Sequence, residues 1–235
     1  VELRLLDTNP IDHVQWTPER PEGVVDRRVV VNPTQARALL AAVREIEPEL
    51  EAFFACIYYA ALRPAEVLHL AVDDCELPGQ GWGWLHLRGS TQHAGSDWTD
   101  TGEAREDRGL KHRARSSTRD VPAPPPLVEI LRRHIETFGT GPGGRLFPAR
   151  GYRQGPVSAG TYLRVWRQAR AAVLADPERS PLARRPYDLR HACVSLWLNA
   201  GVPATQVAEW AGHSVHVLLK VYAKCIDGQD EAARR

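Results

Sequence analysis

The sequence predicts a mainly α-helical domain with a small antiparallel β-sheet or hairpin, an α+β fold class. Apolar residues recur at three- and four-residue steps over most of the chain, as they do on the buried faces of helices. Residues 82–88 alternate as in a strand, and residues 118–121 offer a partner strand. With 235 residues, of which 43% are apolar, the chain can bury a core in one large or two modest domains.

The first segment has a different character from the rest. Residues 1–27 contain proline and glycine at short intervals and keep no period, so we predict a linker or the tail of a preceding domain. Residues 28–235 are predicted to form the main domain. The chain has no methionine and begins at Val1, and we therefore expect a fragment of a longer protein.

The first helices are indicated by their caps and their apolar faces. Asn32, followed by Pro33 at the first helical position and Gln35 at the capping-box position, predicts the start of one helix. Residues 48–62 are apolar nearly all round, which predicts a central helix. Arg63 interrupts this run, and Pro64 begins another short helix.

The middle of the chain predicts a long excursion between two strands and then two helices. Residues 89–107 are polar and too many for a tight hairpin, so we predict a mobile hairpin excursion that leads to Lys111. The prolines at 122–126 are expected to stop the returning strand. Helices are predicted at 126–138 and 158–174. The second helix carries three arginines opposite its apolar side: Arg164, Arg167 and Arg170. Tryptophans such as Trp82 and Trp84 are expected in core or hairpin packing.

Residues 186–222 predict three consecutive short helices. The first is expected to open at Pro186 and close at Gly201, the second covers 204–210, and the third carries Tyr222. The buried face of the first helix is predicted to hold Leu189, Cys193, Leu196 and Trp197. Arg190, His213 and Tyr222 lie among apolar residues, where an unpaired charge is unfavourable. A bound phosphate would neutralise it.

Several motifs in order carry a family resemblance. The runs LRH (189–191), AGHS (211–214) and VYAK (221–224) resemble the C-terminal signature of the tyrosine recombinase (phage integrase) family, as in integrases of actinobacteria and their phages. ALRPAEV (61–67) is similar to the first-arginine motif, and GLKHRARSSTRDVP (109–122) to the hairpin-lysine segment. The resemblance implies the tyrosine recombinase catalytic-domain fold. It also implies that residues 1–27 follow a missing N-terminal core-DNA-binding domain.

The resemblance also implies catalytic roles. Cleavage of a phosphodiester builds negative charge on the nonbridging oxygens, and two guanidiniums suit that charge. The resemblance assigns this role to Arg63 and Arg190. It assigns Tyr222 as the nucleophile that forms a 3′-phosphotyrosyl bond, and Lys111 as the general acid for the departing 5′ oxygen. Such chemistry needs no ATP, and the sequence has no GxxxxGK[ST] loop.

Supporting roles follow, with one departure from the family. His213 would hydrogen-bond a nonbridging oxygen, and Glu66 would brace Arg63. The family usually has a histidine three residues before the second arginine, where this chain has Tyr187. Tyrosine titrates near 10 and is a poor base at neutral pH. Either His191 shares the deprotonation of Tyr222, or Tyr187 acts mainly as a hydrogen-bonding partner.

DNA is the expected partner, although the net charge is only +1. Basic residues gather at 105–119 and 164–190, and a local basic surface can bind phosphates without a basic total. Backbone contacts are expected from Arg113, Arg115, Arg164 and Arg167. The resemblance implies double-stranded DNA attachment sites, a homotetramer on DNA from a chain that can be monomeric when free, and an accessory excision factor. The expected biology is integration or excision of a mobile element in the bacterial cytoplasm, at the nucleoid.

Other function classes find less support. No run of eighteen apolar residues or signal peptide is present, so no membrane association is expected. The four scattered cysteines show no CxxC and favour reduced thiols. His213 and His216 lack a third ligand, so neither a metal nor another cofactor is expected. Two alternatives stay open: a non-catalytic DNA-binding module, supported by a helix-turn-helix pattern at 187–211, and a relaxing topoisomerase. The sequence does not indicate the DNA target, the general base or the direction of recombination.

Overall fold

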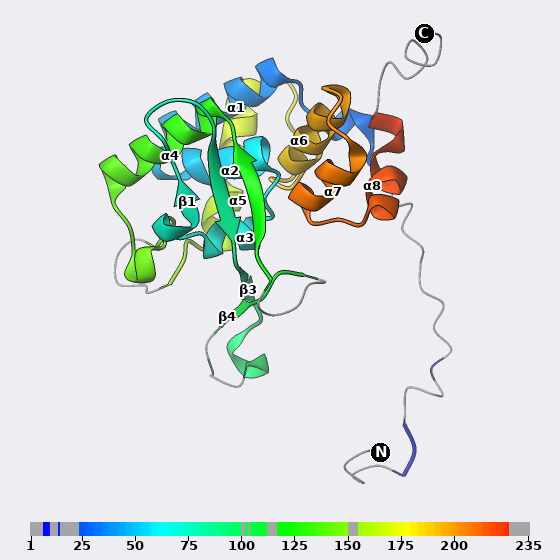
Figure 1. The fold of residues 1–235 in the computed structure, drawn as a ribbon. Coiled ribbons are helices and arrows are strands. Elements are labelled where there is room, and N and C mark those ends of the chain that lie inside the picture. The colour runs from blue at the N-terminus through cyan, green and yellow to red at the C-terminus, as the bar shows by residue number, and fades with distance from the viewer. Residues whose placement is uncertain are drawn as a thin grey trace.

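The computed structural model describes residues 7–9, 14, 24–99, 102, 104–111, 117–149 and 155–225. This part of the chain forms helices around two small antiparallel sheets, which confirms the predicted fold class (Figure 1). The α-helices are α1 (Pro33–Ile46), α2 (Glu51–Ala60), α3 (Pro64–His69), α4 (Pro125–Phe138), α5 (Ala159–Val173), α6 (Asp188–Asn199), α7 (Ala204–Ala211) and α8 (Val215–Tyr222). The strands are β1 (Cys75–Glu76), β2 (Gly83–Leu87), β3 (Ser90–His93), β4 (Arg105–Arg108) and β5 (Arg119–Ala123).

Helix α2 is the centre of the core, as its uniformly apolar sequence predicts. Nine of its ten residues are buried, and it packs against α1, α4 and α6. Phe53 and Phe54 contact the aromatic rings of Tyr162 and Trp166, which come from α5. Burying large aromatic side chains gives much of the stability of a core. The well-packed helix α2 therefore supports the site described below.

Helices α6, α7 and α8 form a second, smaller core with Tyr222 inside it. Its buried residues include Cys193, Val207 and Leu218, one from each helix. In Figure 1 these three helices lie together on one side of the molecule, and the main sheet and α4 lie on the other. Val25 also packs into this cluster, and its N–H donates to the carbonyl of Val221 at 2.8 Å. The segment before α1 is thus attached to α8.

The main sheet has the order β1-β2-β5, with antiparallel pairing throughout. Gly83 pairs with Ala123 and Leu87 with Arg119, so the predicted pairing of these two segments is confirmed. The returning strand does not stop at the first proline, because β5 runs through Pro122. Proline is accommodated since β5 is an edge strand of this sheet. Along β5 the buried positions are 119, 121, 122 and 123.

The hairpin excursion predicted between β2 and β5 contains a second sheet, whose two strands the sequence did not locate. Strands β3 and β4 pair with each other in an antiparallel hairpin, from Ser90 opposite Arg108 to His93 opposite Arg105. Strand β3 lies against α3. Both strands consist of polar residues, so hydrophobic periodicity could not locate them. Lys111 follows three residues after the end of β4 and is exposed.

Several predicted element ends were wrong. The predicted helix 48–62 is a 3₁₀ turn, Pro48–Leu50, followed by α2, which ends where Ala61 adopts a left-handed conformation (φ 51°). A left-handed residue cannot continue a right-handed helix. The helix predicted to open at Pro186 begins at Asp188. It does close where predicted, since Gly201 follows its end with φ 83°.

Some predicted side-chain positions were also wrong. Trp82 and Trp84 are 62% and 39% exposed, because Trp82 lies just before β2 and Trp84 at an outward position of that strand. Leu196 is exposed, although Leu189 and Cys193 are buried as predicted. Arg170 is buried, and its guanidinium donates to the carbonyls of 177, 180 and 182, so it fixes a loop and is not part of a solvated stripe. Within the described ranges, the helices are too short or too polar to cross a bilayer.

Candidate active site

Arg63 sits between the end of α2 and the start of α3. It precedes Pro64, which fixes the first helical position, and Glu66 on the first turn of α3 turns back to it. The Glu66 carboxylate accepts from the backbone N–H of Arg63 at 2.9 Å and from its Nη1 at 2.7 Å. Arg63 Nη2 donates to the carbonyl of Gly212 at 2.9 Å. The expected contact between Glu66 and Arg63 is present in the structure.

Arg119, the first residue of β5, shares the same carboxylate. Its Nη1 and Nη2 donate to the two oxygens of Glu66 at 3.1 and 2.7 Å, and its side chain is 2% exposed. Burial would raise the pKa of Glu66, but the Arg119 and Arg63 charges outweigh burial and lower it to about 2. Gly212 lies directly beside this pair, since a Cβ there would be 2.2 Å from Arg119 Nη1. Only glycine fits this approach.

Arg190 lies deeper, on the first turn of α6. It is fully buried, and its guanidinium donates to the carbonyls of Ala61 and Ala211 and to His213 Nε2, the last at 3.0 Å. The acceptor at Ala61 is the left-handed residue that ends α2. The Nε of Arg190 has no hydrogen-bond partner within the described part of the chain. Arg190 thus connects the ends of α2 and α7.

Tyr222, the last residue of α8, is 0% exposed and its hydroxyl faces α6. The Tyr222 hydroxyl is 2.9 Å from His191 Nδ1. Burial and the neighbouring Arg190 lower the pKa of His191 to about 4, so this imidazole is neutral at pH 7. Burial raises the pKa of Tyr222, although Arg190 opposes the shift. The pair is therefore a neutral phenol beside a neutral imidazole. Tyr187 packs edge-on against the His191 ring, with centroids 5.2 Å apart.

A pocket of about 630 Å³ opens above these groups and is lined by Arg63, Lys111, Tyr187, Gly212, His213, Ser214 and Val217. Burial and three nearby arginines lower the pKa of His213 to about 3, so its ring is neutral. Since His213 Nε2 accepts from Arg190, its proton lies on Nδ1, which has no partner within the described residues. Four of the predicted site residues thus reach one cavity, while Arg190 and Tyr222 lie beneath its lining.

The charges around this pocket are unbalanced. Within the described part of the chain, Glu66 is the only carboxylate hydrogen-bonded to Arg63, Arg119 or Arg190. Three guanidiniums against one carboxylate leave an excess of positive charge beside an exposed lysine. The described residues contain no group of three His, Cys, Asp or Glu side chains arranged to hold a metal ion. A site of this kind suits an anion.

Comparison with protein families decides the assignment of the chain. The model of the phage integrase family matches residues 30–227. The chain belongs to the phage integrase family, the tyrosine recombinases. A comparison with curated protein sequences gave no significant match.

Solved structures with this fold include three integrases or recombinases. The chain aligns with the Tn1549 transposon integrase (residues 82–397) in complex with circular intermediate DNA, with TM-score 0.66 and 16% identity over 89% of this chain and 68% of that chain. It aligns with XerH site-specific recombinase bound to difH substrate, with TM-score 0.58 and 16% identity over 87% of this chain and 53% of that chain. For the catalytic domain of bacteriophage HP1 integrase the TM-score is 0.51 and the identity 14%, over 88% and 93% of the two chains. At such identities the likeness shows the fold of this family member.

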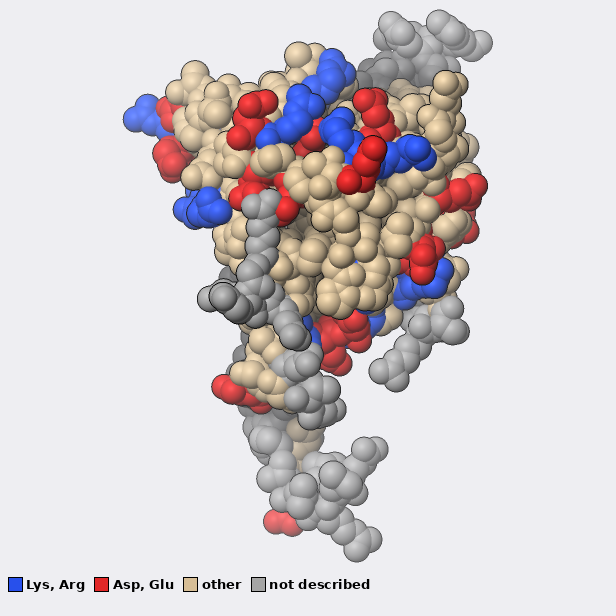
Figure 2. Space-filling model, turned by 90° about the vertical axis from the view of Figure 1, so that its left-hand side faces the viewer, with Lys and Arg blue, Asp and Glu red and all other residues tan. Residues whose placement is uncertain are grey.

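The two described arginines among those predicted to bind DNA do not line the pocket. Arg164 and Arg167 are exposed on α5, and neither lines the cavity. Arg113 and Arg115 lie outside the described residues. Figure 2 shows one face of the molecule, on which basic and acidic side chains are interspersed without an extended area of either sign.

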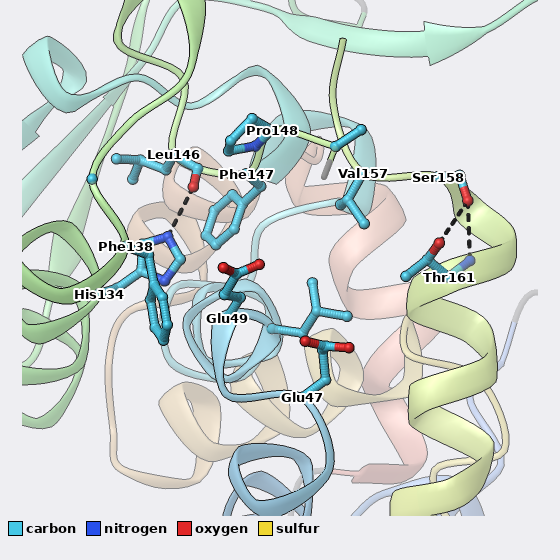
Figure 3. A pocket seen from close by; sticks show the side chains of 13 residues that line it. Glu47, Glu49, His134, Phe138, Leu146, Phe147, Pro148, Val157, Ser158 and Thr161 are labelled. Atoms are coloured by element: carbon cyan, nitrogen blue, oxygen red, sulfur yellow. Dashed lines mark hydrogen bonds between the residues drawn. The ribbon is translucent and has the colours of Figure 1, made fainter. Parts of the chain in front are cut away.

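A second pocket, of about 360 Å³, is lined by residues from the ends of α4 and α5 and the loops beside them (Figure 3). Phe138, Phe147 and Val157 give it an apolar wall, and the carboxylates of Glu47 and Glu49 project toward it. His134 is buried at its edge and shares a hydrogen bond of 2.8 Å with the carbonyl of Leu146. None of its lining residues is lysine or arginine, so it is unsuited to a phosphate.

Sequence reasoning missed two residues of the site. Arg119 alternates with Val121 and Ala123 on the buried face of β5, and an arginine at an inward position of a strand needs a buried partner. That alternation was a signal that could have identified it. Gly212 gave a weaker signal, because a glycine after a helix is usual whether or not a guanidinium lies beside it.

Proposed function

We propose that the chain is the catalytic domain of a site-specific DNA recombinase that cuts and rejoins double-stranded DNA through a 3′-phosphotyrosyl intermediate. The observation that carries the proposal is the cluster of three guanidiniums, two of which bond one carboxylate, beside a pocket that also holds a lysine. Family membership and the fold support it. The cluster would bind one scissile phosphate.

The arginines would stabilise the pentacoordinate state at phosphorus. Arg63 lines the pocket and has N–H groups left for nonbridging oxygens, because its bonds to Glu66 and to the Gly212 carbonyl use only two of its five donors. His213 would donate its unpartnered Nδ1–H to one of these oxygens. Arg190, beneath the lining of the pocket, would contribute positive charge. It can reach a phosphate oxygen by releasing one of its carbonyl partners.

Tyr222 would be the nucleophile and His191 the group that receives its proton. The distance of 2.9 Å between the Tyr222 hydroxyl and His191 Nδ1 supports this over a role for Tyr187 as the base. A neutral imidazole can accept the proton, whereas Tyr187 has a hydroxyl of its own to deprotonate first. Tyr187 would instead hold the His191 ring and face the substrate from the pocket wall.

The attack would form an oxygen–phosphorus bond from Tyr222 and break the bond to the 5′ oxygen, which leaves as a hydroxyl after it takes a proton from Lys111. Because Tyr222 is fully buried, α8 has to shift before its hydroxyl reaches the pocket. DNA binding would supply the free energy for that shift. The rejoining step would run in reverse, with the 5′ hydroxyl as nucleophile.

The biological setting follows from the same proposal. The chain would act with other protomers, as a homotetramer on two double-stranded attachment sites, to integrate or excise a mobile element in a bacterial cytoplasm. The matched Tn1549 integrase, which was solved with circular intermediate DNA, supports a mobile-element role. Arg113, Arg115, Arg164 and Arg167 remain proposed contacts to the DNA backbone, and an accessory factor for excision remains a proposal.

Covalent capture tests the proposal. The chain and its Tyr222→Phe and Tyr162→Phe variants are incubated, in EDTA, with a pool of nicked duplexes of randomised sequence. Adducts that resist denaturant are recovered and sequenced. We expect adducts with the wild type and Tyr162→Phe, and none with Tyr222→Phe, with the recovered sequences converging on a site.

Three results would contradict the proposal. Binding of the pool without any adduct would indicate the non-catalytic DNA-binding module, and adducts that persist in Tyr222→Phe would place the chemistry on another residue. Relaxation of supercoiled DNA without strand exchange between two captured sites would indicate a topoisomerase. Incubation in EDTA makes each result independent of divalent metal.

A further inference from the structure

Lys111 has to be held in place although it lies on a long connection. It belongs to the excursion from residue 88 to residue 118 between β2 and β5, and its side chain is exposed in the pocket. Connections of this length move unless side chains fix them to the body of the domain. A general acid, however, must lie within about 3 Å of the atom that it protonates. Some contact must therefore fix the excursion near Lys111.

One cluster makes such a contact at the base of the β3–β4 hairpin. Asp107 of β4 accepts a hydrogen bond from the Thr91 hydroxyl of β3, and its other oxygen accepts from Arg145 Nη2 at 3.0 Å. His69, the last residue of α3, places Nδ1 3.2 Å from the Thr91 hydroxyl and 3.4 Å from Asp107 Oδ1. We name these four residues, His69, Thr91, Asp107 and Arg145, the hairpin clamp.

The hairpin clamp joins three parts of the chain that are far apart in sequence. His69 comes from α3, Thr91 and Asp107 from the excursion, and Arg145 from the loop after α4. Burial would raise the pKa of Asp107, but the Thr91 hydrogen bond and the His69 and Arg145 charges outweigh it and lower that pKa. The carboxylate form is thus the one that the clamp favours. Gly89 lies tightly against His69, where a Cβ would be 2.8 Å from Nε2.

The hairpin clamp connects the segment before Lys111 to α3, the short helix that Arg63 precedes. Arg63 precedes the first residue of α3 and His69 is the last, so the six-residue helix spans roughly 9 Å between them. Asp107 is four residues before Lys111, and Leu110 between them is buried. The phosphate-binding arginine and the lysine are therefore fixed to the two ends of one rigid element.

We propose that Asp107 is a positioning residue, which holds the excursion on α3 through the hairpin clamp so that Lys111 meets the 5′ oxygen of a phosphate bound at Arg63. The inference rests on the proposed recombinase function and deepens it. Asp107 acts through Lys111 and does not touch the DNA. Its loss should slow the proton transfer to the leaving group and leave the attack by Tyr222 unchanged.

A change of leaving group tests this separately from the proposed function. Cleavage is measured in single turnover on two forms of a captured site: ordinary DNA, and DNA with sulfur in place of the bridging 5′ oxygen. A thiolate leaves without a proton, so the second substrate needs no general acid. We expect Asp107→Asn to slow cleavage of ordinary DNA about tenfold. This is less than the rate enhancement of roughly 10²- to 10⁴-fold that a general acid contributes. Cleavage of the sulfur substrate should stay within twofold of the wild type.

Three companion variants sharpen the result. Thr91→Val removes one hydrogen bond of the clamp with little change of shape and should behave like Asp107→Asn. Glu106→Gln changes the same kind of charge on the neighbouring position of β4, where the side chain bonds Arg108, and should cleave both substrates as the wild type does. In a Lys111→Ala background, Asp107→Asn should cause no further loss, because both residues act on the same step.

The outcomes separate the two proposals. Equal slowing of both substrates by Asp107→Asn, additive losses with Lys111→Ala, or wild-type cleavage of ordinary DNA by Asp107→Asn and Thr91→Val would overturn the positioning role while the recombinase function stands. No cleavage of either substrate by the wild type would overturn the recombinase function itself. Circular dichroism of each variant identifies a loss of activity that comes from misfolding.

Discussion

Replacing Glu66 by glutamine tests how strongly one carboxylate holds the arginine cluster together. Glu66 is 2% exposed and bonds the guanidiniums of Arg63 and Arg119. Burial is outweighed by these two charges, and the pKa of Glu66 falls from 4.5 to about 2. A shift of this size corresponds to roughly 3 kcal/mol, which agrees with the loss of about 3–5 kcal/mol when one partner of a buried pair is removed. We expect Glu66→Gln to lower the free energy of unfolding at pH 7 by about 3 kcal/mol.

The pH dependence gives this prediction a second, independent check. Because the pKa of Glu66 is lower in the folded state, its contribution is complete above the unfolded pKa of 4.5 and is lost as the pH falls toward 2. The difference between wild type and Glu66→Gln should therefore shrink by about 2 kcal/mol between pH 6 and pH 3. The free energies of unfolding of both proteins are measured by urea unfolding, monitored by tryptophan fluorescence. Glu129→Gln, at a side chain 80% exposed on α4, is the control and should change stability by less than about 0.5 kcal/mol. The reasoning would be refuted if Glu66→Gln had the same free energy of unfolding as the wild type at pH 7. It would also be refuted if the difference between the two proteins did not vary with pH.

Three further predictions follow from the packing. Gly212→Ala should lower stability by at least about 1 kcal/mol more than Gly201→Ala, because both glycines have positive φ but only the first has a guanidinium nitrogen 2.2 Å from the added Cβ; equal thermal unfolding of the two variants would contradict this. His191→Ala should slow formation of the covalent DNA adduct by about 10²-fold and also lower the melting temperature, since the buried Tyr222 hydroxyl loses its partner; an unchanged rate would exclude His191 as the proton acceptor. Trp166→Ala should cost about 3–5 kcal/mol in urea unfolding, since the side chain is 1% exposed, whereas Trp82→Ala, at 62% exposure, should have almost no effect; similar losses would contradict the assigned cores.

The parts of the fold that were predictable are those where local chemistry and burial agree. Asn32 caps α1 and Gln35 completes the capping box, as the sequence indicated. Helix α2 was predicted as central because few of its residues are polar. The ends of elements were less predictable, since Ala61 carries no sign that it adopts a left-handed conformation. The excursion after β2 was predicted as a hairpin, but the sequence did not locate strands β3 and β4 within it, because polar side chains of these strands bond to distant elements.

The site was predictable where motifs point to it and not where tertiary packing decides. Arg63, Lys111 and His213 reach one pocket, as the family resemblance implies. The choice between Tyr187 and His191 as partner of Tyr222 could not be made from sequence, because it depends on which side chain of one helical turn faces α8. The structure brings His191 Nδ1 to 2.9 Å from the Tyr222 hydroxyl. Its role as the base stays a prediction.

Helix α3 explains why short motifs in three separate segments serve one site. Its first turn holds Glu66, which fixes Arg63 and Arg119, and its last residue, His69, belongs to the hairpin clamp beside Asp107. A six-residue helix has little freedom to bend, so a displacement at one end is transmitted to the other. If the hairpin clamp positions Lys111, then Arg63, the proposed phosphate ligand, and Lys111, the proposed general acid, move together. Coupling of this kind would allow α8 and Tyr222 to shift during DNA binding without disturbing the other catalytic groups.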